Sequence, residues 1–193
     1  MTEMAMGRPV RIAAIVWAVA CAALLLPRTD PAVAQDDMNA SAPDAGLIAK
    51  ASIIVRSDPR SVFSAFADPG HMSQFWFTRY DDGLIPGETI SWFLGTDEDA
   101  PSFDVRVIEV VEPERIVIEW PDYDGSMNRV TWTMQETDTG DTLLTITEAG
   151  FRGSREEITR RALNSTGGFN QVILAAKALI EHGVAINVVA DHP

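Results

Sequence analysis

Hydrophobic residues recur at every second position in some stretches of this chain and at every third or fourth position in others. The first spacing predicts strands and the second predicts helices. Residues 47–56 (LIAKASIIVR) alternate small or β-branched apolar side chains with polar ones, as a strand does. Residues 57–70 begin with capping residues and a proline, carry apolar residues three and four apart, and end in Pro-Gly. They predict a short helix, and residues 71–77 (HMSQFWF) predict a second one.

From residue 88 the spacing becomes two and stays so for most of the chain. The turn at residues 112–114 predicts a hairpin, and Asp/Gly-rich stretches separate the other apolar runs. Together with residues 47–56, these runs predict an antiparallel sheet of about six strands. The five later strands are predicted at residues 88–95, 102–111, 114–120, 128–137 and 141–151.

A long amphipathic helix is predicted at the carboxy-terminal end. It begins at Ser154 with a capping box to Glu157, and apolar residues then recur at spacings of three and four. Gly167 and Gly168 interrupt it at a cost of about 1 kcal/mol each relative to Ala. The pair predicts either a kink or a close approach of the helix backbone to another group. Gly183 predicts the end of the helix.

The amino-terminal segment predicts a secretory signal peptide at residues 1–34. Two arginines precede an apolar run of 15 residues, 12–26, and Ala32 and Ala34 precede a predicted cut before Gln35. The run is shorter than the roughly 20 residues of a membrane span. We therefore expect a periplasmic or secreted protein with no integral membrane domain after cleavage.

Two alternatives for this segment are a retained membrane anchor and a lipoprotein modified at Cys21. After the leader, residues 35–46 predict a flexible linker because they are small, polar and without periodicity. The domain organisation expected from the sequence is then a single domain at 47–183 and a tail at 184–193.

Composition narrows the classes of partner and site. The chain of 193 residues has a formal net charge of −13, which argues against nucleic acid and anionic lipid as partners. Its single cysteine lies in the leader, so no disulfide or thiolate metal site is expected. The three histidines are scattered, and no nucleophile elbow, zinc-protease helix or phosphate loop is present. No metal, cofactor or catalytic residue is therefore predicted.

The order of predicted elements and four local segments carry a resemblance to a known superfamily. The chain resembles the START-like superfamily, also called SRPBCC, and its branch of heat-shock-protein-90 ATPase activator homologues. The resemblance covers residues 48–183. Its segments are VRSDPRSVFSAFADP, EPERIVIEW, TITEAGF and STGGFNQVILAAKALIEHG.

This resemblance implies an α+β helix-grip fold, in which a curved antiparallel sheet wraps around the long carboxy-terminal helix. Relatives of this kind often hold an apolar cavity between sheet and helix. The co-chaperone members act in the cytosol, whereas the leader predicts export. The Rieske-oxygenase members need iron ligands, and no such cluster of His and carboxylate residues is seen here.

The domain holds enough large side chains to line such a cavity. Strand alternation places Ile116, Ile118 and Trp120 on one face of their strand, and Trp132 shares a face of its own strand with Val130 and Met134. We expect Trp92, Trp120, Trp132 and Met134 to face the helix. The alternative for each residue is ordinary core packing. The predicted ligand-binding residues are Trp76, Trp92, Phe103, Trp120, Trp132, Met134, Phe169 and Ile173.

Two charged residues interrupt apolar strand patterns. Arg106 separates two valines, and Glu148 follows Ile146 near the end of its strand. They either point into the cavity, where they orient a polar ligand group or serve in acid–base chemistry, or project to solvent from the outer face.

Three functions remain open at this stage. The first is an exported binding protein that holds a small hydrophobic or amphipathic molecule, without a cofactor. The second is a cyclase- or aromatase-type enzyme that uses the same cavity. The third is a protein-interaction domain, similar to a co-chaperone, with a solid core; its protein partner is unknown.

Overall fold

The computed structural model describes residues 46–77, 79–80, 83–95 and 99–191. The predicted leader and its cut site lie outside the described residues. Within them, no helix is both long enough and apolar enough to cross a membrane.

The described residues form one antiparallel sheet and three helices. Strand order is β1-β7-β6-β5-β4-β3-β2. The strands are β1 (Ala49–Val55), β2 (Arg79–Tyr80), β3 (Thr89–Phe93), β4 (Ser102–Val111), β5 (Arg115–Pro121), β6 (Met127–Glu136) and β7 (Thr142–Ala149). The helices are α1 (Pro59–Ala67), α2 (Pro69–Met72) and α3 (Arg155–His182). This arrangement confirms the predicted α+β helix-grip fold.

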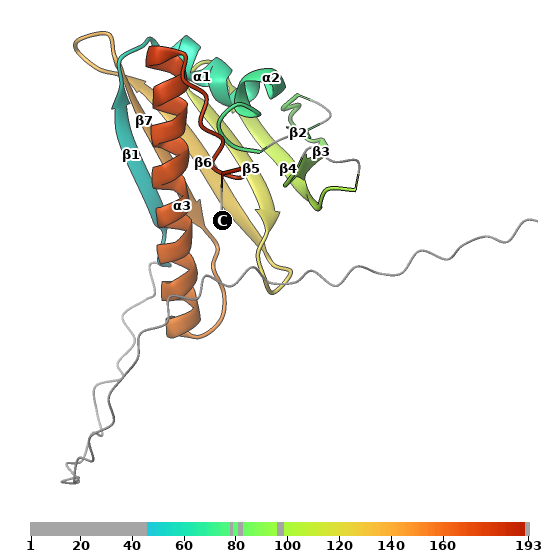
Figure 1. The fold of residues 1–193 in the computed structure, drawn as a ribbon. Coiled ribbons are helices and arrows are strands. Elements are labelled where there is room, and N and C mark those ends of the chain that lie inside the picture. The colour runs from blue at the N-terminus through green and yellow to red at the C-terminus, as the bar shows by residue number, and fades with distance from the viewer. Residues whose placement is uncertain (1–45, 78, 81–82, 96–98, 192–193) are drawn as a thin grey trace, which may run out of the picture. The chain divides into compact units, whose positions relative to one another are not determined.

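The helices cover one face of the sheet. The long helix α3 lies along β1 and β7, while α1 and α2 sit over one end of the sheet (Figure 1). Strand β4 changes register between Val107 and Glu109, an irregularity that bends and twists a strand. The curved sheet therefore wraps around the helix, as the resemblance implies.

Local sequence explains where the helices begin and end. The Asp58 side chain accepts from the Ser61 backbone N–H at 3.1 Å and so caps α1. Ser154 and Glu157 form the predicted capping box at the start of α3. Gly183 ends α3 in the left-handed conformation, with φ of 65°.

Three local predictions differ from the structure. The second short helix begins at Pro69 and not at residue 71, because Asp68 caps it with a hydrogen bond to the His71 N–H. The sheet has a seventh strand, the two-residue β2. Helix α3 is continuous through Gly167 and Gly168, and a Cβ at either would meet nothing within 4 Å, so the predicted close approach is wrong.

The segment after α3 returns over the domain. Its Val188 N–H donates to the Phe75 carbonyl at 3.2 Å, and the Asn187 amide donates to the Ser73 carbonyl at 2.7 Å. Val188 and Val189 are partly buried against the core. Residues 184–191, predicted as a tail, therefore contact the region that follows α2 (Figure 1).

Candidate functional site

The inner face of the sheet carries a continuous cluster of aromatic rings. The ring centroid of Trp76, which follows α2, lies 5.8 Å from that of Trp92 and 5.9 Å from that of Trp132. It lies 6.1 Å from Trp120 and 6.4 Å from Phe169 on α3. Tilted and edge-to-face pairs at these separations are favourable. With Phe103, whose ring centroid lies 6.3 Å from that of Trp92, six of the eight predicted ligand-binding residues therefore meet in one cluster.

The aromatic cluster reaches the surface at its β4–β5 side. Phe103 and Trp120 are only partly buried, and their ring centroids lie 6.4 Å apart. Phe169 stacks on Trp120 at 6.0 Å with an interplanar angle of 20°. These two rings are therefore partly accessible to solvent, unlike those of Trp76, Trp92 and Trp132.

The interior next to Trp132 is filled by side chains. Met134 and Ile173 are 4 % and 1 % exposed, so both belong to the core. A small space there admits no water molecule, and a ligand-sized cavity is therefore not present at this place. Its lining residues are Phe66, Met72, Leu84, Trp92, Ile116, Ile118 and Trp132.

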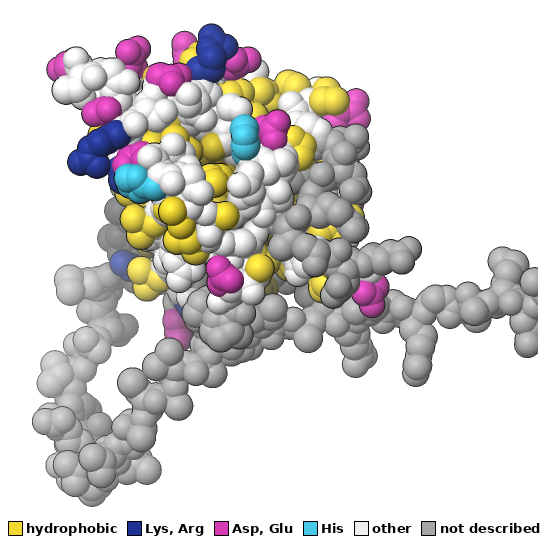
Figure 2. All heavy atoms as spheres, turned by 45° about the horizontal axis from the view of Figure 1, so that its top comes forward, with side chains coloured by type: hydrophobic (Ala, Val, Ile, Leu, Met, Phe, Trp, Pro, Cys, Tyr) yellow, Lys and Arg dark blue, Asp and Glu magenta, His cyan; other side chains and the backbone are white. Residues whose placement is uncertain are grey.

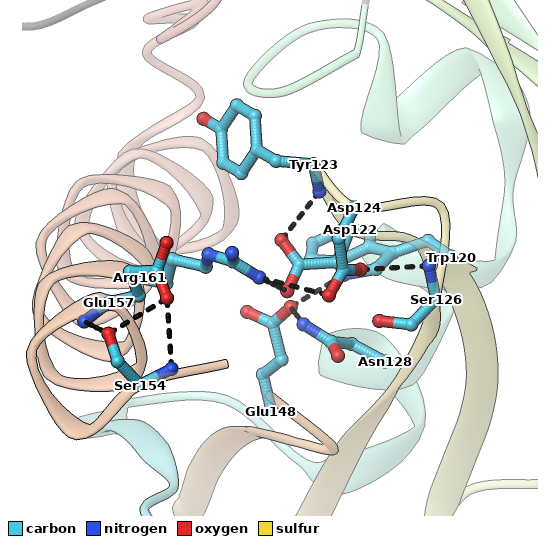
Figure 3. Close-up of polar contacts among 10 residues, drawn as sticks. All are labelled: Trp120, Asp122, Tyr123, Asp124, Ser126, Asn128, Glu148, Ser154, Glu157 and Arg161. Atoms are coloured by element: carbon cyan, nitrogen blue, oxygen red, sulfur yellow. Dashed lines mark hydrogen bonds and ion pairs between the residues drawn. The ribbon is translucent and has the colours of Figure 1, made fainter. Parts of the chain in front are cut away.

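Glu148 brings a carboxylate into this apolar interior. Burial alternates along β7, so Leu144, Ile146 and Glu148 all take inward positions, and Glu148 is only 3 % exposed. Its Oε1 accepts from Trp120 Nε1 at 2.8 Å and from Asn128 Nδ2 at 2.9 Å (Figure 3). The inward alternative holds for this residue.

The second oxygen of that carboxylate, Oε2, has no hydrogen-bond partner among the described residues. It lies on the side of the carboxylate turned toward α3 (Figure 3). Asn128 Oδ1 also has no partner among the described residues. The Gly150 backbone lies close to this oxygen, because a Cβ at Gly150 would come within 3.3 Å of it, and this leaves little room for a ligand atom. A buried acceptor without a partner is costly. Glu148 Oε2 is therefore the atom best placed to accept from a ligand.

A partly buried ion pair joins α3 to the β5–β6 turn in the region drawn in Figure 3. Arg161 of α3 donates to Asp122 at 2.9 Å and lies 3.5 Å from Asp124, both in the β5–β6 turn (Figure 3). The hydrogen bond to Asp122 raises the pKa of Arg161, so the guanidinium stays charged. Two carboxylates thus already share this guanidinium.

Arg106 lies on the opposite face of the sheet. Its side chain is 56 % exposed and bonds Glu119 at 3.3 Å, while Arg129 bonds the other Glu119 oxygen at 2.8 Å. The hypothesis that Arg106 points into the interior is wrong, because Val105 and Val107 take the inward positions on either side of it. Arg106 and Glu148 therefore form no inward ionisable pair.

Sequence reasoning missed two parts of this site. Asn128 shares the inward alternation of β6 with Val130 and Trp132, and this spacing was a usable signal. The ion pair of Arg161 with the β5–β6 turn joins residues far apart in sequence, and the spacing of charges along the chain contains no signal for it.

A second hollow lies at the other end of the molecule. It has a volume of about 580 Å³, is polar, and is bounded by α1, α2 and the end of α3, with Arg60 and His71 among its lining residues. Figure 2 faces this end and shows hydrophobic side chains interspersed with acidic and histidine side chains. In the part of the chain that the structure describes, no cluster of three or more His, Cys, Asp or Glu residues could hold a metal ion.

Comparison with known proteins now identifies the family. Residues 56–180 match the family model described as "Activator of Hsp90 ATPase homolog 1-like protein". The chain belongs to this family. The match begins directly after β1 and covers the other strands, α1, α2 and most of α3, so the residues matched to the Hsp90-activator-homologue family include the aromatic cluster and Glu148. No curated protein matches the chain.

Several solved structures share the fold. Protein SSP2350 from Staphylococcus saprophyticus is 25% identical with a TM-score of 0.60, over 72% of this chain and 96% of that one. The Aha1 protein from Colwellia psychrerythraea, solved as a dimer, is 11% identical with a TM-score of 0.59, over 72% and 98%. DynU16, from the dynemicin biosynthetic locus, is 18% identical with a TM-score of 0.60, over 72% and 48%, so the match spans about half of its length. The last two show likeness of fold alone.

Proposed function

We propose that this member of the Hsp90-activator-homologue family is an exported protein that binds a small hydrophobic or amphipathic molecule between the sheet and α3. The observation that carries the proposal is the buried Glu148 carboxylate, whose Oε2 has no partner among the described residues. Buried polar atoms in folded proteins are nearly always hydrogen-bonded. A ligand that donates to Oε2 would remove this cost, and the neighbouring rings of Trp120 and Phe169 offer its apolar part a surface.

The proposed binding site lies at the end of the interior where Phe103 and Trp120 are partly exposed. The closed space beside Trp132 takes no part in it, because that space admits no water. Export enters the proposal from the leader sequence alone.

A second candidate function is an interaction domain with a solid core. The observation that favours it is the filled space beside Trp132. Under this alternative, Glu148 Oε2 is satisfied by water, and the domain retains no small molecule.

Dye binding to the full chain tests the proposal. We expect an environment-sensitive apolar dye to bind saturably and to be displaced by neutral apolar compounds. Phe103→Ala should weaken dye binding because it removes a partly exposed ring from the site. Leu174→Ala is the matched control: Leu174 is 59 % exposed on α3, so its loss should leave dye affinity unchanged. Absence of saturable binding, or equal effects of both substitutions, contradicts the proposed site.

Native mass spectrometry of the chain purified from its own envelope fraction tests retention and export together. We expect a mass that corresponds to an amino terminus at Gln35, plus that of a retained small molecule. An uncut chain contradicts cleavage before Gln35 and favours the retained anchor, and a ligand-free chain that also fails to bind dye favours the interaction domain.

A further inference from the structure

We propose that the molecule held in this interior is an organic cation, an amine whose ammonium group donates to Glu148 Oε2. Its apolar part would lie against Trp120 and Phe169. This inference rests on the proposed function and adds the chemical class of the ligand. It follows from the charge around the site, from the nature of the neighbouring rings and from the way the carboxylate is held.

The side chains around the site carry more negative than positive charges. Glu148, Asp122 and Asp124 contribute three carboxylates, whereas Arg161 contributes one guanidinium. That guanidinium is bound to Asp122 and Asp124, so Glu148 receives no salt bridge from the described residues. A buried carboxylate without a cation is costly, and a ligand ammonium would supply the missing positive charge.

The aromatic rings beside Glu148 favour a cation as well. Trp120 donates its Nε1–H to the carboxylate, and Phe169 stacks on the same indole at 6.0 Å. Trp76 meets both rings edge-to-face. Because the indole N–H lies in the plane of its ring, Glu148 meets the edge of Trp120. An ammonium therefore gains from these rings only where it lies over a ring face, which attracts cations and not anions.

Two donors fix the carboxylate in the orientation that this binding requires. Trp120 Nε1 and Asn128 Nδ2 both bond Oε1, at 2.8 and 2.9 Å. Oε2 is thereby left unpaired on the side turned toward α3 (Figure 3). Trp120 and Asn128 act as positioning residues in this arrangement, and Glu148 is the residue that contacts the ligand.

Three probes of nearly equal size separate charge from shape: phenethylamine, phenethyl alcohol and hydrocinnamate. Isothermal titration calorimetry on the full chain should show the amine binding at least about tenfold more tightly than the alcohol. Hydrocinnamate should bind most weakly because its carboxylate meets Glu148. In NMR spectra of the wild type, the Trp120 indole N–H resonance should shift on addition of the amine, since that N–H donates to the same carboxylate.

Glu148→Gln should abolish the preference for the amine over the alcohol, because it removes the negative charge that the ammonium pairs with. The matched control is Glu119→Gln, because Glu119 lies on the outer face between Arg106 and Arg129. It should retain the wild-type preference. If Glu148→Gln does not fold, the amine-to-alcohol ratio and the Trp120 shift in the wild type still decide the matter.

The outcomes distinguish this inference from the proposed function. Alcohol bound as tightly as amine, or hydrocinnamate bound most tightly, overturns the cation inference and leaves ligand binding intact. Failure of all three probes also overturns it, and the dye and mass-spectrometric experiments then decide separately whether the interior binds anything.

Discussion

At the residue scale, Glu181 near the end of α3 shows how a carboxylate outside the site is stabilised. Its Oε1 accepts from the Arg56 backbone N–H at 2.6 Å, and Lys177 also donates to it. Lys177 donates at 2.7 Å to the Ile54 carbonyl too, so the three residues join α3 to the end of β1. The Glu181 side chain is 6% exposed, and its charged form is favoured by donors from two elements.

This arrangement predicts a pH dependence of stability. The Arg56 backbone hydrogen bond, followed by the Lys177 hydrogen bond, lowers the pKa of Glu181 from its ordinary value of 4.5. The stabilisation is therefore fully present above pH 4.5 and is lost as the pH falls through the lower folded-state pKa. We expect Glu181→Gln to reduce the free energy of unfolding at neutral pH, and the difference from wild type to shrink below pH 4.5.

Urea denaturation at a series of pH values measures this difference. Glu136→Gln is the control, because Glu136 is exposed at the end of β6. If the free energy of unfolding that Glu181→Gln loses relative to wild type stays constant down to acid pH, the role assigned to Glu181 is contradicted.

Single residues also show what the sequence could and could not predict. Strand alternation places Glu148 on the same face as Ile146, and places Arg106 on the face opposite Val105 and Val107. The apolar neighbours of each residue were therefore enough to predict that Glu148 points inward and that Arg106 points outward. The hydrogen bond from Trp120 to Glu148 was not available, because β5 and β7 are separated by β6 and spacing within a strand contains no information about distance across a sheet.

At the scale of elements, α3 contains two adjacent glycines that lower its helix propensity and that packing does not require. Gly167 and Gly168 are exposed, and a Cβ at either would meet nothing within 4 Å. Their helical interior positions cost stability relative to Ala. The pair directly precedes Phe169, the α3 residue that stacks on Trp120. The turn of the helix next to the proposed site is therefore the one with the lowest intrinsic helix propensity.

Replacing these glycines should stabilise the protein. We expect Gly167→Ala and Gly168→Ala each to raise the free energy of unfolding by about 1 kcal/mol, because Ala fits without contact and favours the helix. Gly183→Ala is the control with opposite sign, since φ there is 65° and an L side chain costs about 1 kcal/mol or more. Thermal and urea unfolding measure both effects. Destabilisation by the first two substitutions would show that the glycines serve a packing role.

The long elements were predictable because each repeats its pattern many times. Strands β4 to β7 and helix α3 all lie within their predicted ranges, give or take a few terminal residues. The short elements were not. Helix α2 has four residues, too few for any periodicity, and is set by its Asp68 cap; β2 has two residues and exists only by pairing with β3.

At the scale of the whole molecule, one sheet face is covered by helices and the other is left to solvent. The outer face carries ion pairs such as that of Arg106 with Glu119, while the inner face carries the aromatic cluster. The net charge of −13 and the acidic surroundings of Glu148 have the same sign, so both favour a cationic ligand over an anionic one. Sequence could predict this division of faces from periodicity, but not how fully side chains fill the interior, because filling depends on packing across several elements.

The segment after α3 packs against the core, and its removal tests how much it contributes to the stability of the domain. A chain that ends at Gly183 loses the Val188 bond to Phe75, the Asn187 bond to Ser73 and the partial burial of Val188. We expect a loss of about 2 kcal/mol in the free energy of unfolding, measured by urea denaturation with tryptophan fluorescence. Asn187→Ala alone should cost about 1 kcal/mol, because it leaves the Ser73 carbonyl without this donor. Equal stability of the chain that ends at Gly183 and the full chain would mean that this segment rests on the domain without stabilising it.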